Sequence, residues 1–352
     1  MSKVSEIIEN KKIYNGITLE ERMKECHTPA VSIAIIENFE ISETYAYGLK
    51  RRATKENVTE DTLFQAGSIS KPVFAVAVMR LVERGTLDID TDISEYLIGY
   101  DLPTFDNQKH KITLKQILSH NAGLNLHGFF GHLQGQRIPT IEEILNGALP
   151  ANHSKLKLIK TPETGFQYSG GGYVLAQKII IDVCKDDFCD LMDELVLSPF
   201  LMIQSTYLQP LPKDRFNEIA LGYNNYDLQI QGGYNVNPQL SAAGLWTTPS
   251  DLARLGIEIM KALKGKSDFL EKKTVELMTT KAYENYPYGL GFAVNECKKG
   301  LTFGHGGANI GYRSNMIFCP ADGSGIAVMQ NSDIGAEIPN EVTDAFKEIY
   351  GW

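Results

Sequence analysis

Ser68 and Lys71 are the two residues whose types and spacing most directly suggest chemistry. They stand three apart in Ser68-Ile69-Ser70-Lys71, directly before an apolar run that ends at Met79. Residues three apart share one face of a helix, so a helix beginning here places the hydroxyl beside the amine. A serine becomes a good nucleophile when a base takes its proton, and burial can lower the pKa of a lysine enough for that task. The pattern therefore indicates a serine nucleophile with its own base.

The same spacing occurs a second time, and it also has a simpler explanation. Ser154 and Lys157 repeat the pattern, but Lys160-Thr161-Pro162 follows them instead of an apolar helix. Serine is a preferred N-cap residue in any protein, so Ser68 fits a purely structural role as well. The surroundings favour Ser68 over Ser154, and further groups are needed to decide between nucleophile and cap.

Strand-like runs lie near both ends of the chain, and helix-like runs lie between them. The predicted strands are 30–37, 41–48, 288–294, 312–318 and 325–330, and the predicted helices include 72–84, 113–119, 171–183, one that Thr248 caps before Pro249, and 340–350. This order predicts an α+β fold in which both chain ends build an antiparallel sheet flanked by helices, with a mostly helical insert. The predicted domains are 1–66 with 285–352 for the sheet and 67–284 for the insert, with the active-site cleft between them.

Two further segments carry groups that can act beside a serine and a lysine. Tyr168 precedes a predicted helix, and a phenol near an ammonium is shifted towards phenolate and can exchange protons. His305 opens the run His305-Gly306-Gly307-Ala308, in which glycines let the backbone approach a substrate and a strand-edge N–H can serve an oxyanion. Without a shared site, Tyr168 would be a packed core residue and the glycines an ordinary turn that exposes His305.

Composition and charge exclude several classes of function. A net charge of -9 and a pI of about 5.4 disfavour a nucleic-acid partner. Residues 1–12 lack the apolar core of a signal peptide, and no apolar run is long enough to cross a membrane, so we expect a cytoplasmic protein. The cysteines are odd in number and scattered, which indicates free thiols in a reducing compartment. His127 and His132 lack the spacing of a zinc site, so no metal is expected.

Taken together, the three motif segments resemble the serine β-lactamase and penicillin-binding-protein superfamily, in particular its class C-like branch of β-lactamase-related hydrolases, esterases and D-amino-acid peptidases. That family carries S-x-x-K, then Y-x-N, then K-T-G or H-x-G, in this chain order. Segments 112–124 and 241–252 also resemble it. The class A pattern is absent, because neither Ser-Asp-Asn nor Lys-Thr-Gly occurs. A class A-like stretch at Glu142 is better explained by a capping box of Thr140 and Glu143.

The resemblance implies a role for each matching residue. Ser68 would be the acylated nucleophile, Lys71 the proton acceptor, and Tyr168 the partner that activates the attack or the deacylating water. His305 would take the place of the third-motif cation, and the backbone N–H groups of Ser68 and Ala308 would form the oxyanion hole. The reaction is then acyl transfer through an acyl-enzyme followed by hydrolysis, without a metal or organic cofactor.

Departures from the family pattern bear on the substrate. Gly170 stands where the second motif usually has asparagine, and Gly306 replaces the usual threonine before Gly307, so the predicted substrate cleft lacks two side-chain hydrogen bonds. We therefore expect cleavage of a small ester, amide or peptide-like molecule, with no membrane partner. A β-lactamase or D-alanyl-D-alanine carboxypeptidase is an alternative. A non-hydrolytic penicillin-binding receptor or scaffold is the alternative of another class.

Overall fold

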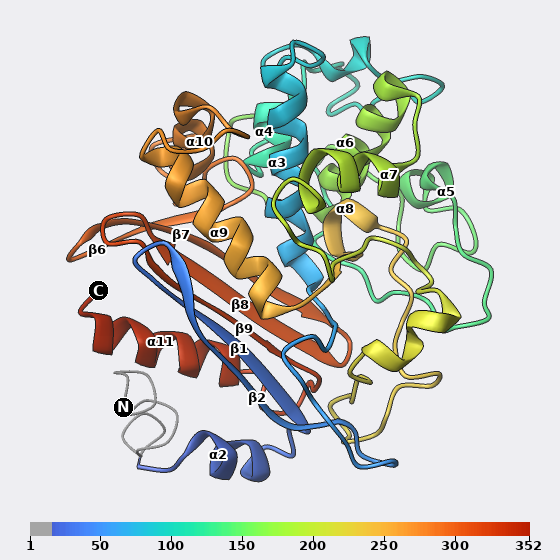
Figure 1. The fold of residues 1–352 in the computed structure, drawn as a ribbon. Helices are drawn as coiled ribbons and strands as arrows, with labels where there is room; N and C mark the ends of the chain where they lie inside the picture. Colours follow the sequence, from blue (N-terminus) through green and yellow to red (C-terminus); the bar gives the residue numbers. More distant parts are fainter. Residues whose placement is uncertain (1–15) are drawn as a thin grey trace.

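A seven-stranded antiparallel sheet dominates the computed structural model, which describes residues 16–352 (Figure 1). Its order is β3-β2-β1-β9-β8-β7-β6, so the N-terminal hairpin joins the C-terminal strands where β1 pairs with β9. The strands are β1 (Ala30–Glu37), β2 (Glu40–Arg51), β3 (Glu56–Asn57), β6 (Ala293–Cys297), β7 (Gly300–Asn309), β8 (Tyr312–Cys319) and β9 (Ser324–Gln330). The prediction of an α+β fold, with the sheet built from both chain ends, is confirmed.

Helices cover both faces of this sheet (Figure 1). On one face, α2 (Leu19–Glu25) and α11 (Ile338–Tyr350) bury an apolar cluster against alternate residues of β1, such as Ile33. On the other face, α9 (Pro249–Leu263) crosses the strands, and Gly256 lets it approach β8 closely, because a Cβ there would lie 2.3 Å from the Phe318 ring. Both faces are therefore buried, which explains why β1 is apolar almost throughout.

The middle of the chain is mostly helical. Its remaining elements are β4 (Phe64–Gln65), α3 (Ser70–Glu83), α4 (Leu114–Leu118), α5 (Ile141–Asn146), α6 (Gly170–Cys184), α7 (Phe188–Met192), α8 (Leu240–Ala243), β5 (Trp246–Thr247) and α10 (Lys272–Thr279). Helix α3 is buried from Ser70 to Met79, so its apolar run forms the centre of this region. The boundaries at 66/67 and 284/285 stay a prediction, and α9, from the predicted insert, packs on the sheet. No helix within residues 16–352 combines the length and apolarity needed to cross a bilayer.

Local signals fixed the starts of several elements, with one exception. Thr248 accepts a hydrogen bond from the Asp251 amide at the start of α9, as its position before proline predicted. The capping box at the start of α5 is also confirmed.

The strand predicted at 288–294 is wrong at its beginning, because β6 starts at Ala293. Gly291 adopts a φ of +94° and donates its N–H to the Leu118 carbonyl, which bends the chain away from the sheet. Residues 1–12, where we expect no signal peptide, lie outside the described residues.

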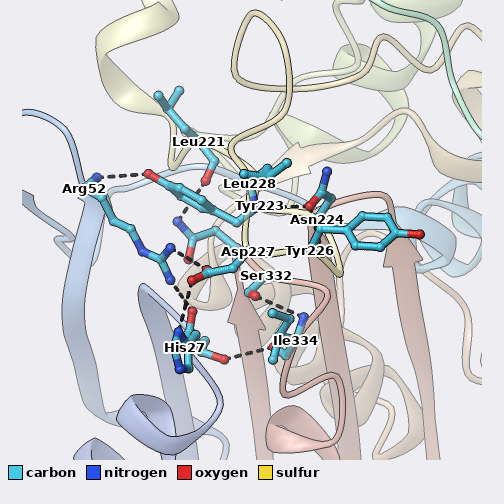
Figure 2. A network of polar contacts seen from close by, with 12 residues as sticks. His27, Arg52, Leu221, Tyr223, Asn224, Tyr226, Asp227, Leu228, Ser332 and Ile334 are labelled. Carbon is cyan, nitrogen blue, oxygen red and sulfur yellow. Dashed lines mark hydrogen bonds and ion pairs between the residues drawn. The ribbon is translucent and has the colours of Figure 1, made fainter.

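A polar cluster ties a loop from the middle of the chain to the N-terminal hairpin (Figure 2). The Arg52 guanidinium lies 4.5 Å from the centre of the Tyr223 ring and donates hydrogen bonds to the Asp227 carboxylate and the His27 carbonyl. His27 Nδ1 also lies 3.0 Å from Asp227 Oδ2. The Tyr223 carbonyl accepts a hydrogen bond from the Asp333 amide, 2.9 Å away. Asp333 in turn pairs with Arg313 of β8, 2.6 Å away, which links the cluster to the sheet.

Candidate active site

Ser68 lies in a single 3-10 turn, Gly67–Ile69, that leads directly into α3. Gly67 has a φ of +53°, and a Cβ at this position would lie 2.6 Å from the Ala308 nitrogen of β7. Glycine therefore lets the serine turn and the strand touch, which brings the two predicted oxyanion donors, at Ser68 and Ala308, to adjacent backbones. Ser70, the other serine of the motif, is structural. Its hydroxyl donates to the Gly67 carbonyl and accepts from the Leu245 amide.

Lys71 lies one turn into the helix, and its amine is directed at the serine. The distance from Lys71 Nζ to Ser68 Oγ is 2.9 Å, and Nζ also donates to the Ala242 carbonyl of α8 at 2.9 Å. The lysine is 1% exposed. Burial without a neighbouring carboxylate lowers its pKa from 10.5 to about 7. A large fraction of the amine is therefore neutral near pH 7, as a proton acceptor must be.

Tyr168 stands over the lysine, just before α6. Lys71 Nζ lies 5.0 Å from the centre of its ring. Burial raises the pKa of the phenol well above its usual value, and hydrogen bonding to the Ser68 hydroxyl opposes this only in part. The expected shift towards phenolate is therefore wrong, since a half-neutral lysine does not offset the cost of burying a phenolate. The arrangement suits a protonated hydroxyl that receives and passes on protons beside the serine.

Two histidines pack on the Tyr168 ring, and neither was predicted from the sequence to be part of the site. The ring centre of His120 lies 4.1 Å from that of Tyr168, and the ring centre of His127 lies 4.7 Å away. His120 is fully buried, and its Nδ1 accepts a hydrogen bond from the Ser169 amide. Burial and the charge of Lys71 hold its pKa well below the usual value, so this ring is neutral. His120 follows α4 in the segment whose family resemblance was noted, which was the available signal.

His305 belongs to a strand and is buried, which excludes the alternative of an exposed turn. Strand β7 runs without a break from Gly300 to Asn309 between β6 and β8. The His305 ring centre lies 6.2 Å from that of Tyr168. Burial, together with the charge of Lys71, lowers the pKa of His305 to about 3. The residue occupies the predicted place on the strand, but its imidazole is neutral at physiological pH.

The three glycines predicted for the cleft have different surroundings. A Cβ on Gly307 would lie 1.9 Å from the Ala66 carbonyl oxygen, so only glycine lets β7 pass this close to the serine turn. A Cβ on Gly306 would meet nothing nearer than 3.8 Å. A Cβ on Gly170 would lie 3.0 Å from the Phe129 ring and 3.1 Å from the His127 carbonyl oxygen. The space beside Gly170 is thus filled by a loop, whereas the space beside Gly306 is open.

A cleft of about 350 Å³ brings most of the predicted residues together. Its walls are Ser68, His127, Tyr168, His305, Gly306, Gly307, Ala308, Arg313, Ser314, Ala336, Pro339 and Asn340. Lys71 lies directly behind Ser68, and Gly170 lies under the loop rather than on the surface of the cleft. Arg313 and Asn340 could not be predicted from the sequence, because they carry no motif and reach the cleft through the fold of β8 and α11. His127 also lines the cleft, although its spacing in the sequence indicated no role in a site.

Comparisons with known proteins bear on the family and the fold of this chain. The family model described as Beta-lactamase matches residues 18–345. Penicillin-binding protein 4 of Amycolatopsis lactamdurans is 23% identical over 93% of this chain and 86% of its own. The octameric penicillin-binding protein homologue of Pyrococcus abyssi superposes with a TM-score of 0.74 at 22% identity, over 95% of this chain and 76% of that one.

A second solved structure has the same fold over almost the whole chain. D-amino acid amidase of Ochrobactrum anthropi superposes with a TM-score of 0.74 at 20% identity, over 99% of this chain and 96% of its own. Likeness at this level of identity establishes the fold rather than the substrate. With the family model covering nearly the full length, the chain belongs to the beta-lactamase family of serine hydrolases.

Proposed function

We propose that this protein cleaves a small ester or amide through an acyl-enzyme formed on Ser68. The observation that carries the proposal is the 2.9 Å contact between Ser68 Oγ and the amine of Lys71, a buried lysine whose pKa is lowered to about 7. A lysine that is charged at neutral pH could cap or pair with a neighbour but could not accept a proton. Here the amine has the geometry and the protonation state of a general base.

The first half of the reaction forms the acyl-enzyme. Neutral Lys71 takes the proton of Ser68 as the oxygen attacks the substrate carbonyl, and the backbone N–H groups of Ser68 and Ala308 stabilise the oxyanion. The tetrahedral intermediate then collapses and the bond to the leaving group breaks. The proton held by Lys71 reaches the leaving oxygen or nitrogen through the Tyr168 hydroxyl, which gives one proton and receives another.

The second half of the reaction releases the acid. A water molecule takes the place of the leaving group and attacks the ester carbonyl on Ser68. Its proton returns to Lys71 through the Tyr168 hydroxyl, and the proton then passes to the Ser68 oxygen as the acyl group leaves. The protonated state of Tyr168 supports this relay, because a phenol has a hydrogen to donate whereas a phenolate has none. His305 and His120 stay neutral throughout, so neither competes with Lys71 for the proton.

The volume of the cleft supports a small substrate. Its volume of about 350 Å³ is at the lower end of ligand pockets. Peptide-like amides fit the same chemistry, and one similar structure is that of a D-amino acid amidase.

A nucleic-acid partner stays disfavoured by the net charge of -9. The cytoplasm remains the proposed location, and recovery of the protein from the extracellular fraction of its source cells would contradict it.

A single assay separates the proposal from its alternatives. The protein is incubated with 4-nitrophenyl acetate, with N-acetyl-D-alaninamide and with benzylpenicillin, and product release is followed beside the intact mass of the protein. We expect turnover of the ester or the amide, with an acyl adduct on Ser68 detectable early in the reaction. The matched controls are Ser68→Ala, which should abolish both signals, and Ser154→Ala at the second S-x-x-K occurrence, which should change neither.

The other outcomes identify the alternatives. Multiple turnovers of benzylpenicillin would favour a β-lactamase, and a stable penicilloyl adduct without turnover of any substrate would favour a binding receptor. If no reagent reacts, or if Ser68→Ala reacts like the parent, the assignment of Ser68 as the nucleophile is wrong.

A further inference from the structure

The loop that carries His127 occupies the place where the second motif lacks a side chain. Gly170 donates its N–H to the His127 carbonyl at 3.2 Å, and Gly171 donates to the Leu126 carbonyl at 3.0 Å. Any Cβ on Gly170 would press against that carbonyl and against the Phe129 ring. The absence of a side chain at position 170 is therefore coupled to the position of this loop. The glycine leaves room for the backbone that holds His127.

The loop directs the His127 imidazole into the cleft. The residue is among those that line the cleft with Ser68, and its ring packs at 4.7 Å on Tyr168. Within residues 16–352 no side-chain or backbone hydrogen bond engages this imidazole. Partial burial and the charge of Lys71 lower the pKa of His127, so the ring is neutral and offers one donor and one acceptor. Such a ring can donate to the C=O of an amide or accept from its N–H.

The charges around the cleft disfavour a substrate with a free ammonium group. Among the described residues that line the cleft none is acidic. Arg313 is the basic side chain there, and its charge is shared with Asp333, 2.6 Å away. A cationic group on the acyl part would lie near Lys71 without a carboxylate to pair with, at an unfavourable desolvation cost. A neutral amide in the same place requires no counter-ion.

We propose that His127 is a specificity-determining residue that reads a neutral amide in the acyl part of the substrate, so that N-acylated amino-acid esters or amides are preferred over those with a free amine. This inference rests on the proposed function, because it concerns the acyl group transferred to Ser68. It assigns to a loop imidazole a contact that the glycine at position 170 cannot make.

The test compares three esters that share one leaving group. N-acetylglycine 4-nitrophenyl ester and 4-nitrophenyl pentanoate have acyl chains of equal length, but only the first contains an amide. Glycine 4-nitrophenyl ester carries the free ammonium. We expect kcat/KM in the order N-acetylglycyl above pentanoyl above glycyl, after correction for the uncatalysed rates. In His127→Phe, the ratio of N-acetylglycyl to pentanoyl should fall about three- to tenfold, the range for one hydrogen bond between neutral groups.

Matched variants distinguish a hydrogen bond from a change of shape. His127→Gln keeps a donor and an acceptor and should retain most of the N-acetylglycyl preference. His110→Phe alters a histidine on a loop outside the cleft and should leave the ratio unchanged. A ratio that His127→Phe does not alter, or a parent enzyme that prefers the glycyl ester, would overturn the role of His127 while leaving ester cleavage at Ser68 intact. Absence of turnover for all three esters would instead overturn the proposed function and this inference with it.

Discussion

The chain contains two S-x-x-K segments with the same spacing and different surroundings. At Ser68 the backbone turns into α3, so the lysine one turn later points back at the serine and is fully buried. At Ser154 the backbone is extended: Leu158 forms an antiparallel bridge with Leu124, and buried Leu156 and Leu158 flank exposed Lys157. Residues three apart on an extended chain point to opposite sides, so this pair does not converge.

The comparison shows that spacing alone supplies no chemistry. Helical backbone brings the hydroxyl and the amine together, and burial then lowers the pKa of the amine until it can accept a proton. Ser154 and Lys157 have neither condition, because their segment is not helical and both residues are exposed. The S-x-x-K spacing therefore supports catalysis only where the backbone is helical and the lysine is buried. Matched substitutions at the two segments test this conclusion.

The largest expected effect is on the two lysines. Lys71→Met replaces the proposed base with an uncharged side chain of similar volume. It should lower kcat/KM for a 4-nitrophenyl ester by about 10²- to 10⁴-fold, the contribution of general base catalysis. Lys157→Met, at the exposed segment, should leave kcat/KM within twofold of the parent. Steady-state kinetics on both variants measure this directly. Retention of more than a tenth of the activity by Lys71→Met would exclude Lys71 as the base.

The pH dependence of the parent follows from the lowered pKa of Lys71. The amine must be neutral to take the serine proton, so kcat/KM should rise about tenfold per pH unit below pH 7 and level off above it. His305, with a pKa of about 3, cannot produce this limb, because it is already neutral throughout the range. Initial rates between pH 5 and 9 with an ester of non-ionising acyl group provide the profile. A profile without an inflection between pH 6 and 8 would contradict the assignment.

The same lowered pKa predicts a change in stability with pH. Between pH 7 and 10.5 the unfolded chain keeps a proton on Lys71 that the folded chain has lost, so the unfolding free energy of the parent rises with pH there. Lys71→Met has no such proton. Its stability relative to the parent should therefore be highest below pH 7 and decline by about 3 kcal/mol by pH 9, since each of the two pH units in that window is worth about 1.4 kcal/mol.

Urea denaturation at pH 6 and pH 9 measures this difference, with Lys157→Met as the matched control. The control should keep a constant offset from the parent at both values, because its side chain is exposed in the folded chain as in the unfolded one. A constant offset for Lys71→Met as well would show that burial does not perturb the lysine.

The sequence predicted the parts of this molecule that depend on local rules. The starts of α5 and α9 followed from capping residues, and β1, β8 and β9 from short apolar runs between turns. Ser68, Lys71 and Tyr168 were placed in one site by their chain order, which carried the family resemblance. The false strand start before Ala293 arose because Gly291 makes a tertiary hydrogen bond that no local pattern reveals.

What the sequence could not supply is the environment of each group. Nothing in the residues around Tyr168 indicates that burial would keep it a phenol, or that His305 would be neutral beside Lys71. His127 belongs to none of the three motifs, and it becomes part of the cleft because its backbone pairs with Gly170. These properties depend on which segments pack together, so they follow from the tertiary structure.

The smallest expected effect concerns Gly170 and Gly306, the two glycines that depart from the family pattern. Like the two S-x-x-K segments, they are the same residue type in different surroundings. Gly306→Ala adds a Cβ with no neighbour nearer than 3.8 Å, so stability should change by less than about 1 kcal/mol, the scale of glycine's entropic cost in a strand. Gly170→Ala places its Cβ 3.0 Å from the Phe129 ring and 3.1 Å from the His127 carbonyl, which is hydrogen-bonded to residue 170 itself. The overpacking should cost about 1–3 kcal/mol in spite of alanine's helix preference. Urea denaturation of both variants compares them, and equal stabilities would mean that the loop yields freely, so that Gly170 is not what holds His127 in the cleft.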